Sequence, residues 1–267
     1  PMASMLLALM NHLREHGKPA VTWYFVASCD EESGALGARD LVRRGFRCDG
    51  MVVGEPTLLR PVGSHKGCVR HRVAVRGLAA HSSTPERGAN AIHAAAAFIT
   101  QAEAEVQASA ARCGEGRKAA PTFSTGIIRG GDQVNSIPDD VSFETDCRLP
   151  PGMEAGEVER FLENVAMKVA ADRPSIDFRF ERTQSYPAFH LAADSAFRRV
   201  IAPLCEGGWH EPATYATNAG IYAAAGIPCV VFGPGDMALA HTAEEHIALD
   251  QIAQGAVLLG RCVAAAR

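Results

Sequence analysis

Hydrophobic and polar positions in residues 1–67 follow two periods in turn. Helical spacing at 2–16 and 35–44 alternates with apolar runs at 21–28 and 51–53 that are typical of buried strands. This order predicts a parallel, doubly wound sheet with helices on its faces. Residues 183–267 continue the same style, and the elements expected there are helices at 193–205, 217–225 and 247–265 around a strand at 228–232.

The pattern between these two regions differs and predicts an inserted domain. The elements expected there form the order β-α-β-β-α-β, at about 69–75, 88–109, 122–129, 141–149, 153–171 and 175–182, with a mobile loop at 110–120. That order is the ferredoxin-like split motif. The fold class is therefore α/β, with a doubly wound, mostly parallel catalytic domain in two parts (1–67 and 183–267) and an inserted lid or dimerisation domain at 68–182.

Composition narrows the class of partner. The 267 residues carry 26 Lys and Arg against 30 Asp and Glu, without a basic block, which argues against nucleic acid as a partner. No apolar stretch approaches the roughly 18 residues of a membrane span. The eight cysteines form no C-x-x-C pair and lie mostly in apolar runs, as reduced cysteines do in a cytoplasmic protein.

Three acidic residues stand at the end of the first predicted strand. Asp30, Glu31 and Glu32 follow the run 21–28 and precede a helix. Ligands of open α/β sheets bind at the carboxyl ends of strands, and packed carboxylates repel unless protons or a cation neutralise them. An ordinary acidic helix start explains the tripeptide alone about equally well, because Asp and Glu favour that position.

Two further junctions change that balance. Glu55 follows the strand 51–53, and Pro56 restricts it to an extended conformation. His241 precedes Thr242 and Glu245, which have the spacing of a capping box and predict a helix start. Each residue alone has a routine structural explanation, as a turn or a satisfied histidine. Carboxylates and an imidazole together form a ligand set that suits zinc.

The ordered motifs of the chain resemble the zinc aminoacylase and carboxypeptidase family, which includes acetylornithine deacetylase and succinyl-diaminopimelate desuccinylase. The motifs are Asp30-Glu31-Glu32-x-Gly-x-x-Gly, Val53-Gly54-Glu55-Pro56-Thr57, His65-Lys66-Gly67, Gly77-x-x-Ala80-His81-Ser82-Ser83, Asn135-Ser136-Ile137-Pro138, Asp146-x-Arg148 and Gly226-Ile227-Pro228 through Gly233-Pro234-Gly235. They span essentially the whole chain. The His65 and His81 motifs are most similar to those of the acetylornithine deacetylase branch.

The resemblance implies a function and a role for each matching residue. It implies hydrolysis of the amide bond of an N-acyl amino acid at two zinc ions, for which cobalt or manganese are possible substitutes. The implied zinc ligands are Glu32, Glu55 and His241, and the implied general base and acid is Glu31. His81 matches a lid histidine that reaches the neighbouring subunit of a homodimer.

The same resemblance implies the substrate-binding residues. Asn135 and Arg148 match lid residues that grip the carboxylate of the substrate, and Gly233 lies in a matching substrate-binding loop. Arginine suits that role because its planar fork pairs bidentately with a carboxylate.

Two of the family's five metal ligands have no counterpart here. They are a His in a Gly-His-x-Asp segment and a bridging Asp in an Asp-Met-Lys-Gly-like segment, and Pro1-Met2-Ala3 resembles the residues directly after the latter. We therefore expect the sequence to be a fragment that is inactive by itself. A split chain or a non-catalytic dimerisation relative are the alternatives, and the intact Glu31 and His81 favour the fragment.

Other functional classes have weaker support. A thiol amidase would use Cys29, but the neighbouring carboxylates would raise the pKa of its thiol and no partner base lies in the motif. A nucleotide-binding module lacks both G-x-G-x-x-G after a strand and a Walker sequence.

Overall fold

The computed structural model describes residues 1–112 and 120–266, which divide into two compact units. Unit 1 consists of Pro1–His65 and Phe189–Arg267, and unit 2 is Lys66–Ala188. The assignment of residues 1–67 and 183–267 to a catalytic domain, and of 68–182 to a lid or dimerisation domain, stays a prediction. Within the described residues, no helix is both long and apolar enough to cross a membrane.

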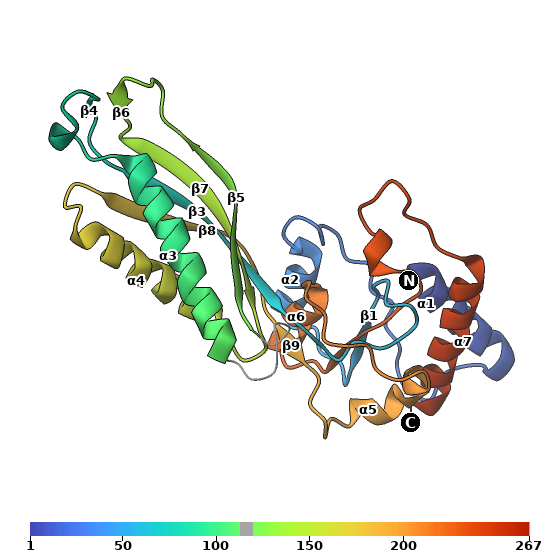
Figure 1. Ribbon diagram of the computed structural model, residues 1–267. Coiled ribbons are helices and arrows are strands. Elements are labelled where there is room, and N and C mark those ends of the chain that lie inside the picture. Colours follow the sequence, from blue (N-terminus) through green and yellow to red (C-terminus); the bar gives the residue numbers. More distant parts are fainter. Residues whose placement is uncertain (113–119, 267) are drawn as a thin grey trace. The chain divides into compact units, whose positions relative to one another are not determined.

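Unit 1 is built on a short parallel pair of strands. Strand β1 (Met51–Val53) pairs with β10 (Cys229–Val231), and Met51 lies opposite Cys229. Helices lie around this pair: α1 (Met2–His16) packs against α7 (Leu249–Ala265), and α2 (Leu36–Arg43) packs against α6 (Asn218–Ala224) (Figure 1). A second, antiparallel pair joins β2 (Ser64–His65) to β9 (Phe189–His190).

The prediction of a buried strand at 21–28 is wrong. These residues form no strand, and the side chains of Tyr24, Phe25 and Val26 are exposed. Apolar, β-branched sequence favours a strand only where a neighbouring strand takes up its backbone hydrogen bonds. In the described part of the chain β1 pairs with β10, and no strand pairs with 21–28. The acidic run Asp30–Glu32 therefore follows an extended loop.

Two helix predictions also need correction. No helix begins at Thr242, whose backbone N–H binds the carbonyl of Leu239, and α7 starts only at Leu249. The Glu245 carboxylate accepts the N–H of His241 at 3.2 Å instead of capping Thr242. The expected helix 193–205 is broken into α5 (Phe197–Val200) and a 3₁₀ turn, η2 (Ala202–Cys205), because Pro203 has no N–H for an α-helical bond. A further 3₁₀ turn, η3 (Met237–Leu239), precedes His241.

Unit 2 has the predicted β-α-β-β-α-β order. Its main elements are β3 (Gly67–Arg76), α3 (Ala91–Arg112), β5 (Thr122–Gly130), β7 (Asp140–Leu149), α4 (Ala155–Ala171) and β8 (Asp177–Tyr186). The sheet order is β5-β7-β3-β8 with antiparallel neighbours. A smaller pair, β4 (Ala80–His81) and β6 (Ser136–Ile137), lies beside the 3₁₀ turn η1 (Pro85–Arg87). Of the loop predicted at 110–120, residues 110–112 continue α3, and 113–119 lie outside the described residues.

The alternation along the strands of unit 2 sorts side chains onto two faces of the sheet. On β3, Val69, Val73 and Val75 are buried, while Arg70, Arg72 and Arg76 between them are exposed. Helices α3 and α4 cover the apolar face (Figure 1), where Phe98 is fully buried between aromatic rings of the sheet. The second face, which carries the arginines, is called the open face below. Together the two units confirm the predicted α/β fold class with an inserted ferredoxin-like unit.

Candidate active site

The acidic run of unit 1 forms a turn that Asp30 closes. Asp30 has a left-handed backbone (φ 64°), and its carbonyl accepts the N–H groups of Gly34 and Ala35 at 3.1 and 2.5 Å. Its carboxylate accepts the N–H of Leu36, the first residue of α2, at 3.3 Å. Asp30 thus stabilises the local turn with both its carbonyl and its carboxylate.

Glu32 meets His241 across unit 1. Glu32 Oε1 lies 3.0 Å from His241 Nε2, and the hydrogen bond to Glu32 raises the pKa of His241. His241 also has a left-handed backbone, with φ at 63°. Such strain in a residue other than glycine persists only where surrounding contacts determine it, and it is concentrated at functional sites. The contact between Glu32 and His241 brings together two of the three predicted zinc ligands.

Glu55 is the predicted zinc ligand whose pKa the surrounding protein shifts most. It lies two residues beyond β1, and burial raises the pKa of its carboxyl to about 7, with further contributions from the charges of Glu31 and Glu32. Burial and the charge of Glu32 likewise raise the pKa of Glu31, while His241 opposes that shift. The three carboxylates and the imidazole therefore share one electrostatic environment.

These four residues fit a metal ion by chemical type. Each ionised carboxylate raises the free energy of its neighbours, and a divalent cation would relieve both the repulsion and the burial of Glu55. Their present arrangement is not a coordination shell: among the described residues, no three His, Cys, Asp or Glu side chains converge closely enough to hold an ion. A bound ion would have to replace the contact between His241 and Glu32.

Gly233 lies against the backbone of Glu55. A Cβ atom at Gly233 would come within 2.6 Å of the Glu55 carbonyl oxygen, so a side chain cannot fit without displacing the candidate ligand. Gly233 and Thr57 also bind each other reciprocally, since the N–H of Gly233 donates to Thr57 Oγ1 and the Gly233 carbonyl accepts from Thr57 N–H, each at 3.1 Å. Gly233 thereby fixes the loop that carries Glu55.

Unit 2 places His81 beside Asn135. The two residues belong to the paired strands β4 and β6 and the turn before them, and Ser82 N–H donates to the Asn135 carbonyl at 3.0 Å. His81 Nδ1 accepts the N–H of Ser83 at 3.2 Å and lies 2.7 Å from Ser83 Oγ. A neutral His81 that accepts at Nδ1 carries its proton on Nε2. This tautomer leaves Nε2–H as a hydrogen-bond donor on an exposed side chain.

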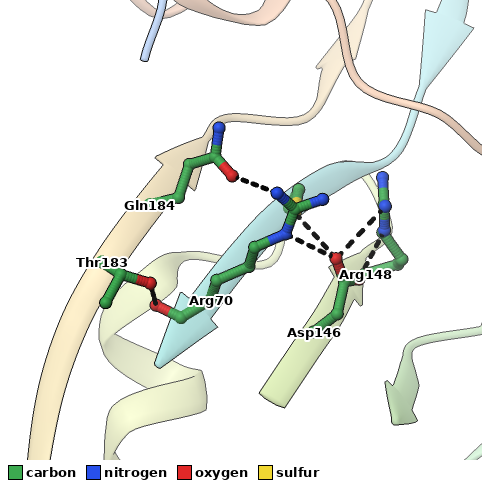
Figure 2. Close-up of polar contacts among 6 residues, drawn as sticks. Arg70, Asp146, Arg148, Thr183 and Gln184 are labelled. Atoms are coloured by element: carbon green, nitrogen blue, oxygen red, sulfur yellow. Dashed lines mark hydrogen bonds and ion pairs between the residues drawn. The ribbon is translucent and has the colours of Figure 1, made fainter. Parts of the chain in front are cut away.

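Arg148 is held by an acidic neighbour in its own strand. Its Nε and Nη2 donate to the two oxygens of Asp146 at 2.7 and 3.2 Å, and Arg70 Nε donates to the same carboxylate at 2.8 Å (Figure 2). Burial would raise the pKa of Asp146, but the hydrogen bonds from Arg70 and Arg148 outweigh it and hold that pKa below its usual value. Sequence reasoning treated Asp146 only as part of a motif and missed this contact.

Sequence reasoning also missed Tyr215, near the acidic residues of unit 1. Burial, with a contribution from Glu55, raises the pKa of the Tyr215 phenol to about 12. A single tyrosine in the loop before α6 has no sequence signal that distinguishes it, so only the folded chain could reveal its place.

Comparison with known proteins shows which proteins this chain resembles. Residues 63–174 match the family model described as a peptidase dimerisation domain. The acetylornithine deacetylase of Myxococcus xanthus is 32% identical over 243 residues, and that match covers 90% of this chain and 63% of the relative. The acetylornithine deacetylase of Vibrio vulnificus is 32% identical over 233 residues, with 86% and 61% covered. The chain thus spans less than two thirds of the length of these relatives.

Solved structures show the same fold at lower identity. Aminopeptidase PepT from Bacillus cereus has a TM-score of 0.77 at 22% identity, covering 98% of this chain and 69% of that one. The YXEP protein of Bacillus subtilis, described as a dinuclear metal-binding peptidase from the M20 family, has a TM-score of 0.71 at 16% identity with the same coverage. The ordered motifs, the match to a peptidase dimerisation domain over residues 63–174 and these relatives agree: over the length that it covers, the chain is similar to acetylornithine deacetylases, and its inserted unit contains a peptidase dimerisation domain.

Proposed function

We propose that this chain carries part of the active site of a zinc-dependent hydrolase that cleaves the amide bond of N-acyl amino acids. The observation that supports this most is the shared environment of Glu31, Glu32, Glu55 and His241 in a chain that is about 30% identical to acetylornithine deacetylases. Glu32, Glu55 and His241 would hold the metal. When bound, zinc supplies the Lewis acidity that makes water a nucleophile near neutral pH.

Glu31 would move the proton of the reaction. It accepts a proton from the water that attacks the amide carbon, and it later donates that proton to the amine nitrogen as the C–N bond breaks. The products are a carboxylic acid and a free amino acid. The raised pKa of Glu31 supports this role, because a general base works best when its pKa approaches the working pH.

Unit 2 would bind the substrate and support a homodimer. The Nε2–H of His81 would donate to the carbonyl oxygen as negative charge develops there, which is the usual electrostatic contribution of such donors. Arg148 and Asn135 would bind the α-carboxylate of the amino acid. Gly233 would hold the loop that carries Glu55 in position. The dimerisation domain supports a homodimer through unit 2, and a cytoplasmic location belongs to the same proposal.

Hydrolysis of N-acetyl amino acids, N-acetylornithine first, tests the proposal. The chain is purified without metal, loaded with zinc, and compared with Glu31→Gln, which removes the base and keeps the shape of the side chain. Activity that requires zinc and falls by at least about a hundredfold in Glu31→Gln supports the enzyme. Zinc binding without hydrolysis supports the predicted inactivity of this chain alone. Absence of both would favour the non-catalytic relative.

A further inference from the structure

Asp146 lies at the centre of a polar network on the open face of unit 2. Figure 2 shows its carboxylate between the guanidinium groups of Arg70 and Arg148, which come from the neighbouring strands β3 and β7. The Arg70 end of the network is held in turn by Gln184, whose Oε1 accepts from Nη1 at 2.5 Å. The network therefore crosses three strands in the order Gln184, Arg70, Asp146.

A β-bulge builds this network. Arg70 lies opposite Gln184 and His71 opposite Arg182, so Thr183 is an extra residue in β8. Side chains alternate between faces along a strand, and one extra residue exchanges the faces of everything beyond it. The bulge therefore brings Gln184 onto the open face beside Arg70, and the Thr183 hydroxyl donates to the Arg70 carbonyl at 3.3 Å.

The contact with Asp146 leaves one side of the Arg148 guanidinium available for a further hydrogen-bond partner. A guanidinium has a side fork, formed by Nε and one Nη, and an end fork formed by the two Nη atoms. Asp146 occupies the side fork, and within the described part of the chain the Arg148 guanidinium donates to no other group. Its end fork therefore points away from Asp146, in a fixed plane and with its charge intact.

Charge balance favours an anion at that fork. One carboxylate faces two guanidinium groups, and the buried ammonium group of Lys66 lies close enough for Arg148 to help lower its pKa, after the larger effect of burial. Asp146 therefore neutralises only part of the local positive charge. A fixed donor fork with surplus positive charge is the arrangement that recognises a carboxylate.

We propose that Asp146 is a positioning residue for substrate recognition: it holds the side fork of Arg148, with Arg70 and Gln184 holding Asp146, so that the end fork meets the α-carboxylate of the substrate. The inference rests on the proposed function, in which Arg148 binds that carboxylate. It adds that Arg148 acts only as part of a network, and that Asp146 contributes to affinity without touching the substrate.

The test compares two probes on zinc-loaded protein. N-acetyl-L-ornithine carries the α-carboxylate, and its α-carboxamide lacks it, so calorimetric dissociation constants for both isolate the carboxylate contribution. Asp146→Asn should weaken binding of the carboxylate about ten- to a hundredfold, the loss expected for one charge-assisted hydrogen bond. Binding of the carboxamide should not change. Arg70→Gln should act in the same direction, with a smaller loss.

Glu144→Gln is the matched control. Glu144 lies two residues earlier on the same strand and face, and it pairs with Arg72 as Asp146 pairs with Arg70. The Glu144→Gln substitution should leave the dissociation constants of both probes unchanged. An equal loss for both probes in Asp146→Asn, or no loss for either, would overturn the inference.

The Arg148 Nε–H resonance in ¹H–¹⁵N spectra separates this inference from the proposed function. The resonance should be slow to exchange in the native chain and fast in Asp146→Asn. An unchanged exchange rate also overturns the positioning role. If the exchange rate rises as expected but the native chain neither binds nor hydrolyses N-acetyl amino acids, the proposed function fails and the hold of Asp146 on Arg148 stands.

Discussion

His241 Nε2 lies 3.0 Å from Glu32 Oε1, although 209 positions separate the two residues in the chain. The contact unites the turn after the extended loop 21–28 with the loop before α7, both in unit 1. It joins an imidazole to a carboxylate that lies close to two others, Glu31 and Glu55. The pair is therefore the natural place to test for a metal.

Zinc should bind through this pair and raise the melting temperature of the metal-free chain. Glu32→Gln should weaken zinc binding by about tenfold or more, since one ligand is lost, and a chelator should reverse the stabilisation. Metal titration followed by scanning calorimetry measures both effects. Glu206→Gln, an exposed carboxylate paired with Arg261 in the same unit, is the control and should bind zinc normally. Equal affinity in Glu32→Gln would remove that residue from the ligand set.

Gly233→Ala should destabilise unit 1 and disturb the Glu55 loop. The new Cβ would stand 2.6 Å from the Glu55 carbonyl oxygen, and relief of such a backbone overlap costs about 1–3 kcal/mol. Chemical denaturation measures the loss, and zinc affinity should fall with it. Gly207→Ala adds a methyl group where no atom lies within 4 Å, so it should be nearly neutral. Equal stability of the two variants would contradict the close approach.

Thr217→Ala should destabilise unit 1 by about 1–2 kcal/mol, the usual cost of losing an N-cap. Thr217 Oγ1 accepts the N–H of Ala219 at the start of α6 and lies 3.0 Å from Nε2 of the fully buried His65. The substitution removes both contacts. Urea unfolding measures the change, and exposed Thr214→Ala is the control. A loss no larger than that of Thr214→Ala would show that the cap is not important.

Phe98→Ala should destabilise unit 2 by about 3–5 kcal/mol, as for other fully buried aromatic residues. The ring of Phe98 has its centroid 5.3–6.0 Å from those of Phe143, Phe178 and Phe180, so truncation leaves a cavity between α3 and the sheet. Ile128→Ala, at a side chain that is 53% exposed, should cost much less. Hydrogen exchange in unit 2 measures both changes, and similar values for the two would place the core elsewhere.

The Asp146 network should make unit 2 sensitive to acid. The pKa of Asp146 is depressed in the folded chain, because its bonds to Arg70 and Arg148 outweigh the effect of burial. The resulting stability is fully present above the ordinary Asp value of about 3.9 and is lost as the pH falls through the depressed pKa. The native chain should therefore exceed Asp146→Asn in stability at neutral pH. That difference should shrink in acid, as urea unfolding across pH 2–7 can show; a constant difference would contradict the ion pairs.

Local pattern was sufficient for most of the elements. The spacing of Val69, Val73 and Val75 predicted β3 and its buried face, because alternation depends only on the geometry of a strand. Helix α1 has the bounds 2–16 that apolar periodicity predicted, because that period depends only on the geometry of a helix. The sequence likewise singled out Glu31, Glu32, Glu55 and His241, because each lies at the end of a predicted strand or at a predicted helix start.

The tertiary structure decided what depends on partners distant in sequence. Residues 21–28 have strand-forming side chains, but a strand needs a neighbour, and among the described residues it has none. Thr242 and Glu245 have capping-box spacing, yet Glu245 binds His241 instead. Sequence by itself determined which chemical groups this protein carries and where local structure forms. Only folding decided that Glu32 meets His241 and that Asp146 holds Arg148, because such contacts depend on long-range packing that no local spacing encodes.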